Sequence, residues 1–398
     1  MVRRVVSRRH EIDALRGLML ILMTLTHLPT RFSEYTGEPF GFVSAAEGFV
    51  FLSAFMVGWI YVARAHKNGI SAMRRAVWRR AFKLYACQVG LLLFLLTVVV
   101  PIGAAKGQPA IVNLVSFFNW EHLTALSSGL VLLYAPPLLD ILPLYILFML
   151  ATPAVLTLSL RRGWAPILTF SFGLWVLAQF GVGQAIYQTI ASAMQFDMPY
   201  AETGAFSLLA WQLLWIIGLW MGSTKAEGHE RDIATPGWIV APAVVVALIF
   251  MVWRHAVGQT PFPSGNELNL LFDKWHLSPL RLLDFLALLV VTLRWGNSLA
   301  LWFARPFLAR LGAASLPVFC AHLVISLLAL AFFGSQYDHR GWDVDVALLI
   351  GTFAALYTVA EVALRAGGPA EDSASGKPTG INSSVAQLPT SITRSPSR

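Results

Sequence analysis

The sequence has few charged residues and few cysteines for its length. Charged residues make up only 13% of the 398 residues, whereas hydrophobic residues make up 57%. Soluble globular domains carry about 25% charged residues, so the composition excludes an ordinary soluble protein. The two cysteines, Cys87 and Cys320, both fall in apolar runs. This placement excludes a disulfide framework.

The sequence also lacks the motifs of several chemistries. It has no glycine-rich P-loop, no GxGxxG after a strand, no CxxC and no HExxH. Nucleotide hydrolysis, dinucleotide chemistry and a zinc site therefore have no support, and we expect neither a metal ion nor a permanently bound cofactor. No serine stands in a nucleophile-elbow context, so no covalent nucleophile stands out.

Long apolar runs dominate the chain. A bilayer core of roughly 30 Å needs about 20 mainly apolar residues per helix. We predict ten membrane spans, near residues 13–30, 42–65, 83–103, 141–160, 165–182, 206–222, 236–254, 280–302, 314–334 and 344–364. The apolar segment 123–139 is short and contains Pro136 and Pro137, so we expect it to be re-entrant or interfacial. The predicted fold is an all-α polytopic membrane helix bundle, with residues 1–366 as one domain.

The distribution of basic residues indicates the orientation of the bundle. If the N-terminus is cytoplasmic, the inner segments hold seventeen Lys and Arg residues and the outer segments hold six. Basic loops tend to stay in the cytoplasm, so the bias favours ten spans with both termini inside. The net charge of +8 then reflects topology and contact with the lipid bilayer, and we expect no nucleic-acid partner. Residues 367–398 are rich in Ser, Pro and Gly, which predicts a disordered cytoplasmic tail.

Ionisable residues within the predicted spans are the first candidates for a functional site, because lipid makes them costly. On the first span Asp13, Arg16 and His27 share a face, since eleven helical steps of roughly 100° return to nearly the same direction. Glu47 enters the second span at about the depth of His27, and Ser44 shares its face. A carboxylate bonded to one imidazole nitrogen raises the basicity of the other. We therefore predict His27 and Glu47 as a catalytic pair, although a purely structural pair fits the spacing equally well.

Four further polar residues are predicted to contact substrates. His322 lies inside the ninth span and Asp140 directly precedes the fourth; both positions also suit structural groups. Lys274 and Arg281 stand at the outer start of the eighth span. Two cations there suit an anionic acyl group or acceptor, and contact with lipid phosphates suits them as well.

The segment 64–83, RAHKNGISAMRRAVWRRAFK, is predicted to be an inner loop with seven cations. Membrane topology and contact with anionic lipid explain such a loop. Arginine forks also suit phosphate groups. The loop is therefore a candidate surface for a polyphosphorylated donor such as coenzyme A, with the contacts made by Arg74, Arg75, Arg79 and Arg80.

Six segments together resemble a known family. They are RRHEIDALRGLMLILMTLTHLP, GFVSAAEGFVFLSAFMVGWIY, DILPLYILFMLATP, AFSLLAWQLLWIIG, LSPLRLLDFLAL and LGAASLPVFCAHLV. This combination resembles the OpgC-type family of membrane succinyltransferases of osmoregulated periplasmic glucans, which is related to the type-three membrane acyltransferases. The similarity runs from about residue 8 to residue 330. Ala54 stands where the family often has glycine, and the tail after residue 367 has no counterpart.

The resemblance implies a site and a reaction in a bacterial inner membrane. Arg16 and His27 correspond to the family's Arg and His on the first helix, and Glu47 to its acidic residue on the second. Asp13 matches the acidic position of the opening motif. The expected donor is acyl-CoA, with a succinyl group, and the expected acceptor is a periplasmic oligosaccharide. His27 is then a general base assisted by Glu47, and Ser44 would lie next to the substrates.

Two other functions fit the same residues. A proton-coupled secondary transporter of a small solute or glycan would also place Arg, His and Glu at membrane depth, as a proton relay. A structural or assembly protein would tolerate replacement of His27. The sequence defines neither the oligomeric state nor the choice between direct transfer and an acyl-enzyme.

Overall fold

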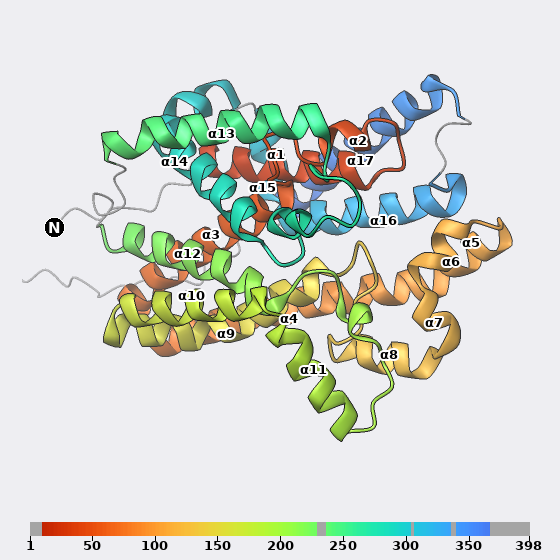
Figure 1. The fold of residues 1–398 in the computed structure, drawn as a ribbon, viewed down its shortest axis with the longest axis horizontal. Helices are drawn as coiled ribbons and strands as arrows, with labels where there is room; N and C mark the ends of the chain where they lie inside the picture. The colour runs from red at the N-terminus through yellow and green to blue at the C-terminus, as the bar shows by residue number, and fades with distance from the viewer. Residues whose placement is uncertain (1–9, 229–235, 304–305, 336–339, 367–398) are drawn as a thin grey trace, which may run out of the picture.

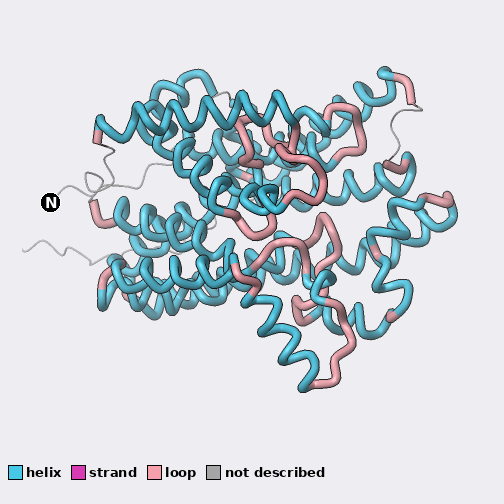
Figure 2. Tube along the Cα trace, in the orientation of Figure 1, coloured by secondary structure: helices cyan, strands magenta, loops and turns pink. Residues whose placement is uncertain are grey.

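The protein is a bundle of long helices. The computed structural model describes residues 10–228, 236–303, 306–335 and 340–366. Over these ranges the chain consists of helices and loops, without a strand (Figure 1, Figure 2). This confirms the predicted all-α class. The predicted disordered tail, residues 367–398, lies outside the described residues.

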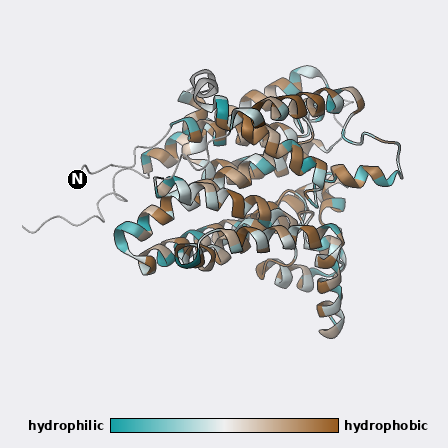
Figure 3. Ribbon diagram, turned by 60° about the vertical axis from the view of Figure 1, so that its left-hand side comes forward, coloured by the Kyte–Doolittle hydropathy of each residue, from teal (hydrophilic) through white to brown (hydrophobic). Residues whose placement is uncertain are grey.

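Each predicted span coincides with a long helix. These helices are α1 (His10–His27), α3 (Ala45–Asn68), α4 (Ile70–Phe94), α9 (Ile141–Arg162), α10 (Ala165–Gln179), α12 (Leu208–Ala226), α13 (Gly237–Val257), α14 (Pro279–Phe303), α16 (Ser315–Phe333) and α17 (Trp342–Ala366). Hydrophobic residues run along much of their length (Figure 3). Among the described helices, seven are long and apolar enough to cross a membrane, or eight if α10 and the bent α11 (Val182–Ala193) form one span. The polytopic membrane bundle is therefore confirmed.

The segment 64–83 is helical, and its prediction as a loop is wrong. α3 continues to Asn68 and α4 begins at Ile70, so only Gly69 separates them. Gly69 makes this turn with a φ of 83°, which glycine adopts without a steric penalty. The cations did not prevent helix formation, because Arg and Lys are good helix formers. α4 then continues through the π-helical turn η1 (Leu95–Val99) into α5 (Val100–Ala105).

The remaining elements are short. They are α2 (Ser33–Thr36), α6 (Pro109–Leu114), α7 (Ser116–Trp120), α8 (His122–Leu130), η2 (Tyr200–Thr203), η4 (Glu267–Phe272) and α15 (Pro306–Ala313). Only α8 falls in the segment 123–139. It has nine residues, too few for a transmembrane helix, and a loop follows it to α9.

Close backbone contacts hold α1 in place. A Cβ atom on Gly17 would lie 2.0 Å from the backbone oxygen of Leu308 in α15. One on Gly312 would lie 1.7 Å from the backbone oxygen of Asp13. Glycine at these two positions lets the helices touch along their backbones. Gly58 allows the same kind of approach between α3 and α12.

Three loops meet near the middle of the bundle, where Figure 2 draws them in pink. They are residues 131–140, residues 194–207, which include η2, and residues 258–278, which include η4. The backbone N–H of Ala135 donates to the carbonyl oxygen of Glu202 over 3.0 Å, and that of Ser207 donates to Trp275 over 2.9 Å. These hydrogen bonds join the loops into one unit, the central loop cluster.

Candidate active site

A pair of histidines lies where α1 and α16 meet. Nδ1 of His27 is 3.1 Å from Nε2 of His322, and their rings are nearly parallel. His322 is fully buried, whereas His27 is partly exposed. Nε2 of His27 accepts no hydrogen bond from the described residues. When Nδ1 carries the proton and donates to His322, this Nε2 is a free base.

The predicted hydrogen bond between His27 and Glu47 is not formed. Both carboxylate oxygens of Glu47 are bonded elsewhere, since Oε2 accepts from the backbone N–H of Ser44 over 3.0 Å and Oε1 accepts from Arg281. Ser44 is the N-cap of α3 and forms a capping box with Glu47. Such a cap fixes the start of a helix. Glu47 therefore positions α3, and His322 takes the place beside His27 that was predicted for Glu47.

Arg281 is neutralised by two carboxylates. It donates to Glu47 and to Oε1 of Glu38, the latter over 2.8 Å. Oε2 of Glu38 accepts from Arg254 over 3.0 Å. All four side chains are buried, so their charges compensate one another where water is scarce. The predicted contact of Arg281 with an anionic substrate is thus replaced by an internal ion-pair network.

Lys274 keeps its charge unpaired within the part of the chain that the structure describes. It lies in the central loop cluster, and its Nζ is 5.1 Å from the centre of the Trp275 ring. Its charge acts on His27 and interacts with Glu47 and Asp140 at longer range. Burial lowers the pKa of Lys274 below its usual value, although Glu47 opposes this shift.

Asp140 also lies in the central loop cluster, directly before α9. Its Oδ2 accepts a hydrogen bond from the backbone N–H of Ala205 over 3.4 Å. Burial raises the pKa of Asp140 to about 6, although the hydrogen bonds and Lys274 oppose the shift. The structure thus brings Asp140 and Lys274 to the same level of the bundle as His27.

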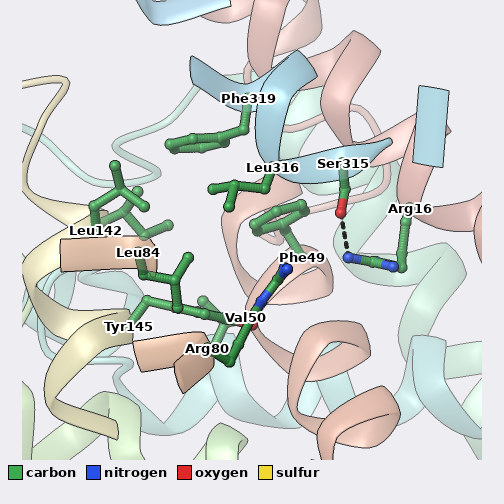
Figure 4. A pocket seen from close by; sticks show the side chains of 11 residues that line it. Arg16, Phe49, Val50, Arg80, Leu84, Leu142, Tyr145, Ser315, Leu316 and Phe319 are labelled. Atoms are coloured by element: carbon green, nitrogen blue, oxygen red, sulfur yellow. Dashed lines mark hydrogen bonds between the residues drawn. The ribbon is translucent and has the colours of Figure 1, made fainter. Parts of the chain in front are cut away.

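A small pocket lies between α1, α3, α4, α9 and α16 (Figure 4). Its lining residues are Arg16, Phe49, Val50, Arg80, Leu84, Ile141, Leu142, Tyr145, Ser315, Leu316 and Phe319. Arg16 donates to the hydroxyl of Ser315 and lies 3.8 Å from the carboxylate of Asp13. The pocket therefore carries two guanidinium groups among mostly apolar walls.

Phe319 connects this pocket to the histidine pair. Its ring stacks on Phe49 with centroids 5.7 Å apart. The same ring contacts His322 edge-on at 4.9 Å. Phe319, which lines the pocket together with Arg16, is thus connected through His322 to His27.

Only one of the four predicted coenzyme-binding arginines, Arg80, lines the pocket. Arg74, Arg75 and Arg79 are exposed on another face of α4. The helical spacing of the buried Met73 and Val77 could have distinguished Arg80 from the other three. That signal was missed because the segment was predicted as a loop.

Other site residues gave no readable signal in the sequence. Glu38, Arg254 and Ser315 enter the site through contacts with residues more than 200 positions away. Pairings of this kind depend on the packing of helices and have no local pattern. No group of three or more His, Cys, Asp or Glu residues in the described ranges is placed to hold a metal ion.

Comparison with known proteins identifies the family of the chain. No curated protein and no solved structure matches it. A family model described as OpgC protein matches residues 8–366. The match extends over all the helices described above and includes both histidines of the site. The chain therefore belongs to the OpgC protein family.

Proposed function

We propose that this chain is a membrane acyltransferase that moves an acyl group from cytoplasmic acyl-CoA to a hydroxyl group of a periplasmic glucan. Family membership supports acyl transfer to a glucan. The observation that carries the proposal is the pocket, which has Arg16 and Arg80 among its lining residues and shares Phe319 with the His322–His27 pair as a contact residue. This arrangement suits a long donor with phosphates at one end and a reactive thioester at the other.

The donor would bind along the pocket. Arg80 and Arg16 suit the phosphates of coenzyme A, since guanidinium groups bind phosphates through paired hydrogen bonds. The exposed Arg74, Arg75 and Arg79 on α4 would attract the same anion from the cytoplasm. The apolar walls then suit the pantetheine arm, which would bring the thioester towards His27.

His27 is the general base in this proposal. Its Nε2 takes the proton of the acceptor hydroxyl while that oxygen attacks the thioester carbonyl. The carbon–sulfur bond then breaks, and the thiolate takes the proton back from the imidazolium of His27. His322 accepts the hydrogen bond from Nδ1 of His27, so it holds the tautomer that leaves Nε2 free. The glucan would reach His27 through the central loop cluster, from the periplasmic side of the bacterial inner membrane.

The transferred group is proposed to be succinyl. Lys274 supports this choice, because it is the cation near His27 that has no ion-pair partner in the described ranges, whereas Arg281 is already neutralised. A distal carboxylate of the acyl chain would pair with it. Lys274→Met should therefore lower kcat/KM for succinyl-CoA by about tenfold or more and leave that for acetyl-CoA nearly unchanged. Equal loss with both donors would reject this role.

Transfer in proteoliposomes tests the proposed function. Purified protein is given labelled succinyl-CoA on one side and glucan on the other, and labelled glucan is measured by mass spectrometry. We expect transfer by the wild type and its loss, by a factor on the order of 10² or more, in His27→Ala. His66→Ala is the matched control, since His66 is exposed at the end of α3. Uptake of unmodified glucan without release of coenzyme A would instead favour a transporter.

A further inference from the structure

Gln88 is a buried amide without a partner. It lies on α4 and is 0% exposed. Neither Nε2 nor Oε1 of its side chain forms a hydrogen bond with any described residue. An amide that loses its hydrogen bonds to water and gains none in return destabilises the folded protein. A leucine would fill the same space without this cost, so the amide at this position needs an explanation.

The helix places Gln88 directly beyond the pocket. Arg80 and Leu84 line the pocket from α4, and Gln88 follows Leu84 by four residues, which is one further turn on the same face. From Arg80 to Gln88 the helix rises by roughly 12 Å. Gln88 therefore extends the row of α4 side chains that begins at the cationic part of the pocket.

The contact between α4 and α16 places Gln88 at the level of the histidines. Cys87, the preceding residue, is a close neighbour of Cys320 on α16. Cys320 follows Phe319, which lines the pocket, and precedes His322 by only two positions. The unpaired amide thus lies one turn beyond the pocket, on the helix segment that neighbours the His322 end of α16.

We propose that Gln88 binds the acyl donor by pairing its side-chain amide with an amide group of the pantetheine arm. This inference rests on the proposed function, because it assigns part of the donor site. The pantetheine arm carries two secondary amides, and each offers one N–H donor and one carbonyl acceptor. The primary amide of glutamine offers the complementary acceptor and donor. One residue can therefore satisfy its own amide and one amide of the arm at the same time.

A leucine substitution separates this role from a structural one. Gln88→Leu keeps the size of the side chain and removes the unpaired amide. We expect a melting temperature equal to or above that of the wild type, because no intramolecular hydrogen bond is lost. We also expect KM for succinyl-CoA to rise by about tenfold, the effect of one hydrogen bond to a buried ligand group. Gln184→Leu, on the exposed face of α11, should change neither quantity.

Thioesters with and without amides make the test specific. Succinyl-pantetheine is compared with the succinyl thioester of a simple alkanethiol, which has no amide. We expect Gln88→Leu to reduce kcat/KM for succinyl-pantetheine by about tenfold and to leave the value for the amide-free thioester at the wild-type level. Equal loss with both thioesters, or a lowered melting temperature, would overturn the inference while leaving the proposed function intact. A wild type that uses neither thioester nor succinyl-CoA would reject the proposed function itself.

Discussion

The catalytic proposal depends at the residue scale on which ring nitrogen of His27 carries its proton. His322 makes its polar contact with Nδ1 of His27, so its role is to position the base rather than to contact the substrate. Because neither imidazole needs a charge in the resting state, the pair can remain buried without a counter-ion. The paired carboxylates of Glu47 and Glu38 are used instead to neutralise Arg281.

Replacement of His322 tests this positioning role. In His322→Phe we expect kcat to fall by about 100-fold while KM for succinyl-CoA stays near the wild-type value, since the tautomer of His27 is no longer held. His322→Gln should recover part of kcat, because its amide oxygen can accept the hydrogen bond from Nδ1. Initial rates over a range of donor concentrations give both constants. Full activity in His322→Phe would remove His322 from the mechanism.

Asp140 provides a test by pH. Its pKa is raised from 3.8 to about 6 by burial, so the folded state holds the proton more tightly than the unfolded state. The free energy of unfolding therefore falls by on the order of a few kcal/mol as the pH rises from about 4 through about 6, where the carboxyl group loses its proton. Asp140→Asn removes this loss.

The difference in melting temperature between Asp140→Asn and the wild type should accordingly grow from pH 4 to pH 6 and remain constant above pH 7. Thermal unfolding in detergent at a series of pH values measures it. Asp197→Asn, at an exposed position on the loop after α11, is the control. A difference that does not change with pH would contradict the raised pKa.

At the element scale, apolar runs were sufficient to locate the helices, because a bilayer imposes their length. The start of α4 was misplaced, since its first thirteen residues are amphipathic and cationic and carry no apolar run. α11 was not predicted because it is a short helix of 12 residues, bent by 76° from α10. Within the site, the helical period was sufficient to predict that Arg16 and His27 share one face of α1. The partners of His27 and Glu47 could not be predicted in this way, because they come from α16 and α14.

The contact of α1 with α15 is the element-scale feature that holds Arg16 and His27 in place. Gly312→Ala would bring a methyl group to 1.7 Å from the backbone of Asp13, and the two helices would have to move apart. We expect a loss of stability of about 1–3 kcal/mol or more and a reduced rate of transfer. Gly173→Ala is the matched control, because a Cβ at Gly173 in α10 meets nothing within 4 Å. It should be neutral or slightly stabilising.

Thermal unfolding and transfer assays on the two glycine variants distinguish packing from helix propensity. If Gly312→Ala melts like Gly173→Ala, α1 and α15 do not depend on backbone contact. If it is destabilised but transfers at the wild-type rate, α1 does not need α15 to hold its catalytic face.

At the scale of the whole molecule, contacts between distant segments agree with the predicted grouping of segments at the two ends of the bundle. At the end predicted to be cytoplasmic, His66 in the last turn of α3 lies 4.0 Å from Glu227 after α12. At the end predicted to be periplasmic, Arg31 after α1 lies 3.4 Å from Asp345 in the first turn of α17. Segments assigned to the same side of the membrane thus touch each other. In the proposed function, the donor then enters from one side of the membrane and the acceptor from the other.

Cysteine labelling tests this orientation directly. In a background of Cys87→Ala and Cys320→Ala, single cysteines are introduced as Lys67→Cys at the end of α3 and Ser264→Cys in the central loop cluster, both at exposed positions. A charged maleimide does not cross the inner membrane. It should therefore label Ser264→Cys in cells with a permeabilised outer membrane, and Lys67→Cys only after the inner membrane is broken. Labelling of Lys67→Cys in intact inner membranes would place the arginine-rich start of α4 in the periplasm, where it could not receive a donor from the cytoplasm.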